Sequence, residues 1–202
     1  MKHTELINDP ALNRTVYLFV SSEEKELTEK LKVLPANFVL LEADNWNDEL
    51  SPWPLKAGKM SFAGEGEKTL EQLLDIRKRH EEKYGSGEAF IGGYSLAGLF
   101  SLYAFRHFDG VISCSSSLWF TGFAEWMKEK EIDRDKRFYL SLGEREEQSR
   151  NQLLASVGER TRELYDKLRE NGNDCVLVMN PGGHFDQPEE RVLMGIKWIL
   201  EG

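Results

Sequence analysis

Ser95 lies between an apolar strand-like stretch and an apolar helix-like stretch, in the segment GYSLAG. Gly93 and Ala97 stand two residues to either side of this serine, and Gly98 follows. Small residues at these positions let the chain turn sharply from a strand into a helix, which pushes the hydroxyl outward at the helix N-terminus. A hydroxyl in that place can act as a nucleophile. The alternative is a serine that only caps the helix.

A serine nucleophile needs a general base, and the chain has four histidines. His184 follows the last strand-like run in a glycine-rich loop, NPGGHFDQP, where a base can meet a nucleophile at the end of a neighbouring strand. The others are expected elsewhere: His3 in a frayed terminus, solvated His80 on a charged helix, and His107 at a helix C-terminus. An ordinary loop histidine remains the alternative for His184. A metal site with Asp186 has too few ligands, so we expect no metal.

A carboxylate should orient the histidine, and it should follow one of the two strands before the last. The strand-like run at residues 110–115 is followed by no carboxylate until Glu125. The run at residues 137–143 is followed by GEREE, which offers three glutamates. We predict Glu146 as the acid, with Glu144 as the alternative. The remaining glutamates fit a solvated charge cluster.

Six short apolar runs alternate with helix-like segments, which predicts a three-layer α/β sandwich with a mostly parallel sheet of about six strands. The runs occupy residues 15–20, 37–43, 88–94, 110–115, 137–143 and 174–180. Helices are expected after Ser95 and at residues 21–34, 69–85, 121–132, 151–171 and 188–202. Residues 44–66 have no steady period and predict a long irregular loop. Sites in open α/β sheets form at the carboxyl ends of strands, where Ser95 and His184 both fall.

The composition limits the class of protein. At 202 residues with 40% hydrophobic content, we expect one α/β domain over residues 1–202. No segment approaches the roughly 18 apolar residues of a membrane helix, and the start lacks the apolar core of a signal peptide. A net charge of −9 disfavours nucleic acid and anionic membranes as partners. Cys114 and Cys175 fit reduced core residues, so the cytoplasm is the expected location, while the oligomeric state stays open.

The segments GYSLAGLFSLYA, SCSSSLWFTGF, FYLSLGERE and NPGGHFDQPEERVLMGIKWIL resemble the esterase branch of the α/β-hydrolase superfamily, which includes esterase D and the enterochelin esterase-like enzymes. The resemblance runs from about residue 15 to the end. It implies a trimmed α/β-hydrolase sheet that begins at the third strand of the full eight-stranded fold. It also implies Ser95 as nucleophile, His184 as base and an acid in the GEREE loop. The chain departs from the pattern at Ala97, in place of a glycine, and in a glutamate where aspartate is usual.

An oxyanion hole would hold the negative charge of a tetrahedral intermediate with two backbone N–H groups. The turn after Ser95 supplies the N–H of Leu96. The resemblance implies that the second donor comes from the loop after the third strand, where Ser21 and Ser22 are the candidates.

The predicted function is two-step acyl transfer from a small-molecule ester through an acyl-enzyme, with no cofactor. Four aromatic residues in loops after predicted strands either wall an apolar or aromatic-binding cleft or pack into the core: Trp46, Trp53, Trp119 and Phe120. Siderophore-type and feruloyl-type esters, acetylated sugars and thioesters all remain open as substrates. A catalytically silent binding protein of the same fold, or an acyltransferase that uses the same serine, is the alternative.

Overall fold

Seven strands form one mostly parallel sheet in the computed structural model, which describes residues 1–21 and 25–201. The order across the sheet is β1-β3-β2-β6-β7-β8-β9, and β1 alone runs antiparallel to its neighbour. The strands are β1 (Lys2–Leu6), β2 (Arg14–Phe19), β3 (Asn37–Glu42), β6 (Glu88–Tyr94), β7 (Gly110–Cys114), β8 (Arg137–Gly143) and β9 (Asp174–Asn180). The six predicted strands are therefore confirmed.

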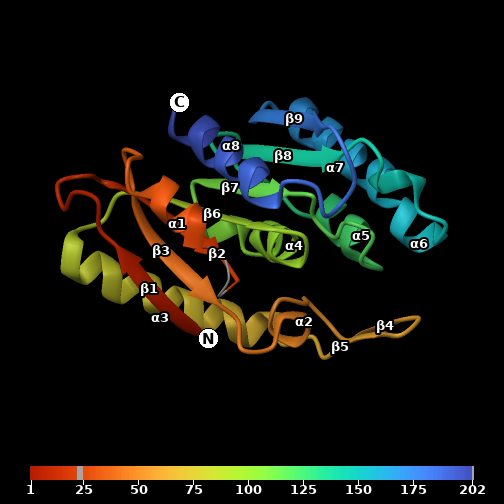
Figure 1. The fold of residues 1–202 in the computed structure, drawn as a ribbon, viewed down its shortest axis with the longest axis horizontal. Coiled ribbons are helices and arrows are strands. Elements are labelled where there is room, and N and C mark those ends of the chain that lie inside the picture. Colours follow the sequence, from red (N-terminus) through yellow and green to blue (C-terminus); the bar gives the residue numbers. More distant parts are fainter. Residues whose placement is uncertain (22–24, 202) are drawn as a thin grey trace.

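Helices cover both faces of this sheet, because successive side chains of its central strands are buried on opposite faces. In β2, Val16 and Leu18 join one core while Tyr17 and Phe19 join the other. One face is covered by α1 (Lys25–Leu31) and α8 (Pro188–Leu200). The opposite face is covered by α3 (Gly66–Tyr84), α4 (Leu96–Tyr103), α5 (Phe123–Lys128) and α7 (Val157–Asn171). Figure 1 shows the resulting layers, which confirm the three-layer α/β prediction.

The antiparallel strand β1 is a correction to the sequence analysis, which placed His3 in a frayed terminus. His3 pairs with Leu41 of β3 instead, at one edge of the sheet. The first three residues of β1 are exposed, so the strand carries no alternating apolar pattern that would reveal it. The sheet therefore has seven strands in the described residues, one more than the sequence pattern predicts.

His80 is also placed differently from the prediction of a solvated side chain. Its exposed fraction is only 3%, and it lies on α3 with its ring packed against β1 and β2. Its Nδ1 atom lies 2.9 Å from Oε1 of Glu5, and its Nε2 atom lies 3.3 Å from Oγ1 of Thr15. Glu5 belongs to β1, the strand that the sequence pattern did not reveal. The burial of His80 depends on this strand, so it could not be predicted either.

Residues 44–66 form regular elements where the sequence analysis predicted an irregular loop. They contain α2 (Trp46–Glu49), capped by Asn45, and a hairpin of β4 (Leu55–Ala57) and β5 (Met60–Phe62). Asp48 and Ser51 accept hydrogen bonds from backbone N–H groups just after β5, which ties down the base of the hairpin. Its tip extends away from the sheet in Figure 1. Three-residue strands are too short to produce a readable period.

The predicted helix at residues 151–171 is broken into two. The first part is α6 (Gln152–Ala155), capped by Asn151, and the second is α7. Ser156 lies at the break, where its hydroxyl donates to the carbonyl of Leu153. Such a local side-chain bond competes with helical backbone bonds.

Cys114 and Cys175 are both free thiols, and burial raises the pKa of Cys114 to about 12.

None of the helices in residues 1–21 and 25–201 has the length and apolar character needed to cross a bilayer.

Candidate active site

The turn at Ser95 has the strained geometry that its neighbours permit. Ser95 follows β6 directly and precedes α4, with φ 58° and ψ −119°, a region that L-residues rarely adopt. A Cβ atom added to Gly93 would stand 2.5 Å from Cβ of Ala97. One added to Gly98 would collide with Oγ of Ser116. Small residues at both positions are therefore a packing requirement of this turn.

Three predicted side chains lie in one hydrogen-bonded series. Oγ of Ser95 lies 3.0 Å from Nε2 of His184, and Nδ1 of His184 lies 2.7 Å from Oε2 of Glu146. The three residues follow β6, β9 and β8, whose carboxyl ends share one edge of the sheet. Glu144, the alternative acid, is exposed, and its N–H donates to the carbonyl of Asn180. In the described chain, the carboxylate that contacts His184 is that of Glu146.

Glu146 is almost completely enclosed, with 4% of its side chain exposed. Its Oε1 atom accepts hydrogen bonds from the N–H of Gly143 at 2.7 Å and from Nη1 of Arg191 at 3.1 Å. Burial raises the pKa of Glu146, but hydrogen bonds from His184, Gly143 and Ser115 outweigh burial and leave the pKa below its usual value. An ionised carboxylate at this place can stabilise a protonated imidazole.

The oxyanion donors remain predictions. Leu96 is the first residue of α4, so its N–H has no acceptor within the helix. Ser21 is exposed directly after Val20 and follows β2, the parallel neighbour of β6. It therefore lies at the same edge of the sheet as Ser95. Ser22 lies outside the described residues.

A run of serines after β7 borders Ser95 and was missed by the sequence analysis. Oγ of Ser117 lies 3.3 Å from Oγ of Ser95. Ser115 has a positive φ of 44°, and its hydroxyl accepts from Nη1 of Arg191 at 2.9 Å. The sequence does carry a signal for them: three consecutive serines at residues 115–117, directly after the apolar strand β7, which is the neighbour of β6 in the sheet.

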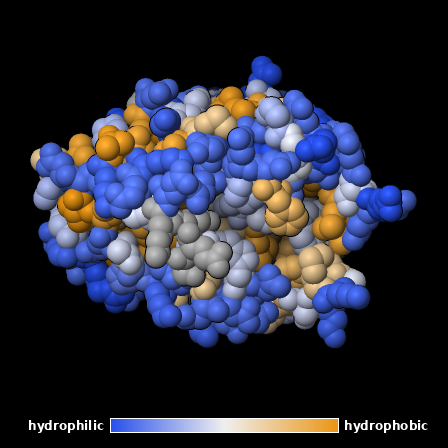
Figure 2. Space-filling view, in the orientation of Figure 1, coloured by the Kyte–Doolittle hydropathy of each residue, from blue (hydrophilic) through white to orange (hydrophobic). Residues whose placement is uncertain are grey.

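A cleft of about 530 Å³ opens over Ser95 and His184. Its apolar lining comes from Met60, Trp119, Leu154, Val157 and Phe185. Met60 lies on the hairpin, which the sequence analysis did not predict, and Leu154 lies on α6, the first part of the broken helix. In Figure 2, hydrophobic residues border a hollow on the right of an otherwise largely hydrophilic face.

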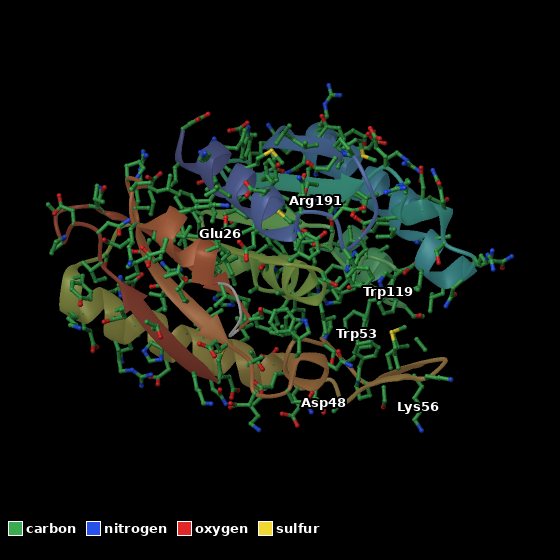
Figure 3. All side chains as sticks on the ribbon, viewed as in Figure 1. Glu26, Asp48, Trp53, Lys56, Trp119 and Arg191 are labelled. Carbon is green, nitrogen blue, oxygen red and sulfur yellow. The ribbon has the colours of Figure 1, made fainter. Side chains whose placement is uncertain are left out.

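Of the four aromatic residues predicted to wall the cleft, the structure places Trp119 on it (Figure 3). Phe120 is buried behind it, with ring centroids 6.1 Å apart. Trp53 stacks on Phe123, so it belongs to the same packed aromatic group. Trp46 is part of α2 and packs on the core. For these three residues the structure fits the core-packing alternative, because their rings pack against the core and do not line this cleft.

The loop of His184 carries one surface ion pair. Oδ2 of Asp186 lies 3.2 Å from Nη2 of Arg145 and accepts from the N–H of Gly183 at 2.7 Å. These contacts make Asp186 a residue that shapes the loop. Within the described chain, no group of three or more histidine, cysteine, aspartate or glutamate residues is arranged to hold a metal ion.

Solved structures resemble this chain along nearly its whole length. A siderophore hydrolase, EstA from Aspergillus nidulans, matches with a TM-score of 0.73 and 20% identity, over 95% of this chain and 84% of that one. An IroE-like serine hydrolase from Shewanella oneidensis matches with a TM-score of 0.83 and 16% identity, over 98% and 75%. A ferulic acid esterase matches with a TM-score of 0.61 and 16% identity, over 94% and 85%. No family model and no curated protein matches the sequence.

These likenesses establish the fold. The chain has the same α/β sandwich fold as these solved structures, with a mostly parallel central sheet between helices.

Proposed function

We propose that this protein is a serine hydrolase that cleaves a carboxylic ester through an acyl-enzyme. The observation that carries the proposal is the continuous series from Ser95 through His184 to Glu146, with separations of 3.0 and 2.7 Å. A binding protein has no need of a hydroxyl, an imidazole and a buried carboxylate in this order. The hydrolases and esterases among the structural neighbours support the same class of reaction.

In the proposed mechanism, Nδ1–H of His184 donates to Glu146, which leaves Nε2 free to take the proton of Ser95. The Ser95 oxygen attacks the ester carbonyl, and the negative charge that develops is held by the N–H of Leu96 and a second donor near Ser21. His184 then gives its proton to the departing alcohol. Water repeats the sequence against the acyl-enzyme and releases the acid.

The cleft supports an ester with an apolar or aromatic part as substrate. Trp119, Met60 and Phe185 offer a flat ring, a flexible side chain and an exposed ring around the reacting serine. Siderophore-type and feruloyl-type esters both carry aromatic or extended groups of this kind. The two classes are named among the neighbours as a siderophore hydrolase and a ferulic acid esterase. We propose no cofactor and no nucleic-acid partner. We also propose a cytoplasmic location, which the two free thiols support.

Turnover of a panel of aryl and acetyl esters by the native protein and by Ser95→Ala tests this function. We expect hydrolysis by the native protein and none above background by the variant. Products formed in the presence of added small alcohols separate a hydrolase from an acyltransferase, because a transferase forms a new ester. Turnover that survives in Ser95→Ala would remove the serine from the mechanism. A folded native protein without turnover on any ester would favour a silent binding protein.

A further inference from the structure

Arg191 is buried at the site, although nothing in its sequence surroundings, PEERVL, marks it out. It lies in the first turn of α8, where Figure 3 labels it, and its side chain is only 2% exposed. Its Nη1 atom donates to Oε1 of Glu146 at 3.1 Å, to Oγ of Ser115 at 2.9 Å and to the hydroxyl of Tyr94 at 3.2 Å. Its Nη2 atom donates to the carbonyls of Pro181 at 3.1 Å and Gly183 at 2.9 Å.

The acceptors of this guanidinium belong to different loops of the site. Glu146 lies in the acid loop after β8, while Pro181 and Gly183 lie in the loop of His184 after β9. A second route to the base passes through Tyr94, whose hydroxyl donates to the carbonyl of His184 at 2.6 Å. The guanidinium of Arg191, which is rigid and planar, therefore connects Glu146 with the backbone of the loop that carries His184.

Stability alone does not account for a buried charge of this kind. Moving a guanidinium out of water is costly, and an apolar side chain of similar volume is often as stabilising as a buried ion pair. Glu146 is the one carboxylate that pairs with Arg191 in the described residues. The charge is therefore best explained by what it does to Glu146.

We propose that Arg191 is a positioning residue that fixes the orientation of Glu146 toward His184. This proposal rests on the proposed function. Arg191 and the N–H of Gly143 both donate to Oε1 of Glu146, so Oε2 is the oxygen that remains for Nδ1 of His184. The packing leaves little freedom, since a Cβ atom added to Gly143 would lie 2.9 Å from Oε1 of Glu146 and 3.0 Å from Nη1 of Arg191.

The test compares Arg191→Met and Arg191→Lys with a matched control, Arg137→Met. Arg137 also bonds a carboxylate, that of Asp174, and a carbonyl of α8, that of Ile199, but at the opposite end of β8. The first readout is the proton signal of Nδ1–H of His184 by NMR, which is shifted downfield and protected from exchange when a carboxylate accepts the proton. The second readout is ester turnover, and the third is the melting temperature.

We expect the His184 signal to broaden or move in Arg191→Met, to be partly restored in Arg191→Lys, and to stay unchanged in Arg137→Met. We expect kcat to fall about 100-fold in Arg191→Met at nearly constant KM, as for a catalytic group displaced by about 1 Å. In Arg191→Lys the positive charge is kept, but a single ammonium group replaces the two guanidinium nitrogens that reach both loops. If Arg191→Met does not fold, Arg191→Lys is compared with the native protein instead.

A double variant separates positioning from general support of the fold. If Arg191 acts through Glu146, then Arg191→Lys in a Glu146→Gln background lowers kcat little further. Independent, multiplicative losses would overturn the proposal, as would an unchanged His184 signal in Arg191→Lys. The NMR readout does not depend on turnover. A native protein with the expected signal but no esterase activity would refute the proposed function and leave the positioning role of Arg191 standing.

Discussion

Replacement of Glu146 by glutamine tests whether the carboxylate of Glu146 sets the tautomer of His184. The expected effect follows from the hydrogen bonds that surround this carboxylate. Two donors, the N–H of Gly143 and Nη1 of Arg191, point at Oε1 of Glu146. The amide oxygen of a glutamine must take that position, which places the amide NH₂ at the position of Oε2. His184 then faces a donor at 2.7 Å, so its Nδ1 must become an acceptor and its Nε2 must carry the proton.

This tautomer cannot accept the proton of Ser95, so the base is lost while the fold is kept. An aspartate-to-asparagine change in a serine protease triad lowers kcat about 10⁴-fold by the same route. A loss of that size corresponds to about 5 kcal/mol of transition-state stabilisation. The melting temperature should change much less, because glutamine keeps the shape of the side chain and both bonds to Oε1.

Steady-state turnover of one aryl ester, measured for Glu146→Gln and for the matched control Glu144→Gln, gives the comparison. Glu144 is exposed and two residues away, so its replacement should leave kcat within about a factor of two. Small and equal losses in both variants would refute the role of Glu146. A large loss in Glu144→Gln alone would move the acid to the exposed position.

Ser95→Gly should melt at a higher temperature than Ser95→Ala, because glycine adopts φ 58° without the strain of roughly 1–3 kcal/mol that a Cβ imposes; equal melting temperatures would mean that the turn is unstrained. Trp119→Ala should change the ratio of kcat/KM between aryl and acetyl esters by about tenfold, as the loss of one aromatic contact implies, whereas an unchanged ratio would place the ring in a packing role. Burial raises the pKa of Glu5, but hydrogen bonds from His80 and Lys83 outweigh it and hold the pKa below 4.5. The stabilisation is therefore present above pH 4.5 and is lost as the pH falls through the folded-state value. In urea, Glu5→Gln should be less stable than the native protein at pH 7, and the difference should shrink in acid; a difference that does not vary with pH would contradict this.

The elements that carry Ser95 and His184 could be predicted because their signals are local. A buried parallel strand is a continuous apolar run, and a sharp turn into a helix needs small residues beside the serine. Glu146 could be selected only by its place after β8. The sequence could not distinguish Glu146 from Glu144 as the acid, because the choice depends on which of the two carboxylates is buried in the folded protein.

What escaped prediction depends on contacts between distant segments. Arg191 resembles a solvated residue on an amphipathic helix, and it is buried because α8 begins at the carboxyl ends of the strands, beside Ser115 and Glu146. His80 looks solvated on α3 until β1 brings Glu5 beside it. The hairpin that carries Met60 has strands of three residues, too short for any periodic signal. These features are set by tertiary structure, which overrides local pattern.

The measurement that tests the central claim most directly is the intact mass of the protein after exposure to a fluorophosphonate. We predict a single adduct on the native protein and none on Ser95→Ala or His184→Ala under the same conditions, because the reagent needs an activated serine and its base. No adduct on folded native protein, or an adduct that persists on Ser95→Ala, would contradict the assignment of Ser95 as the nucleophile.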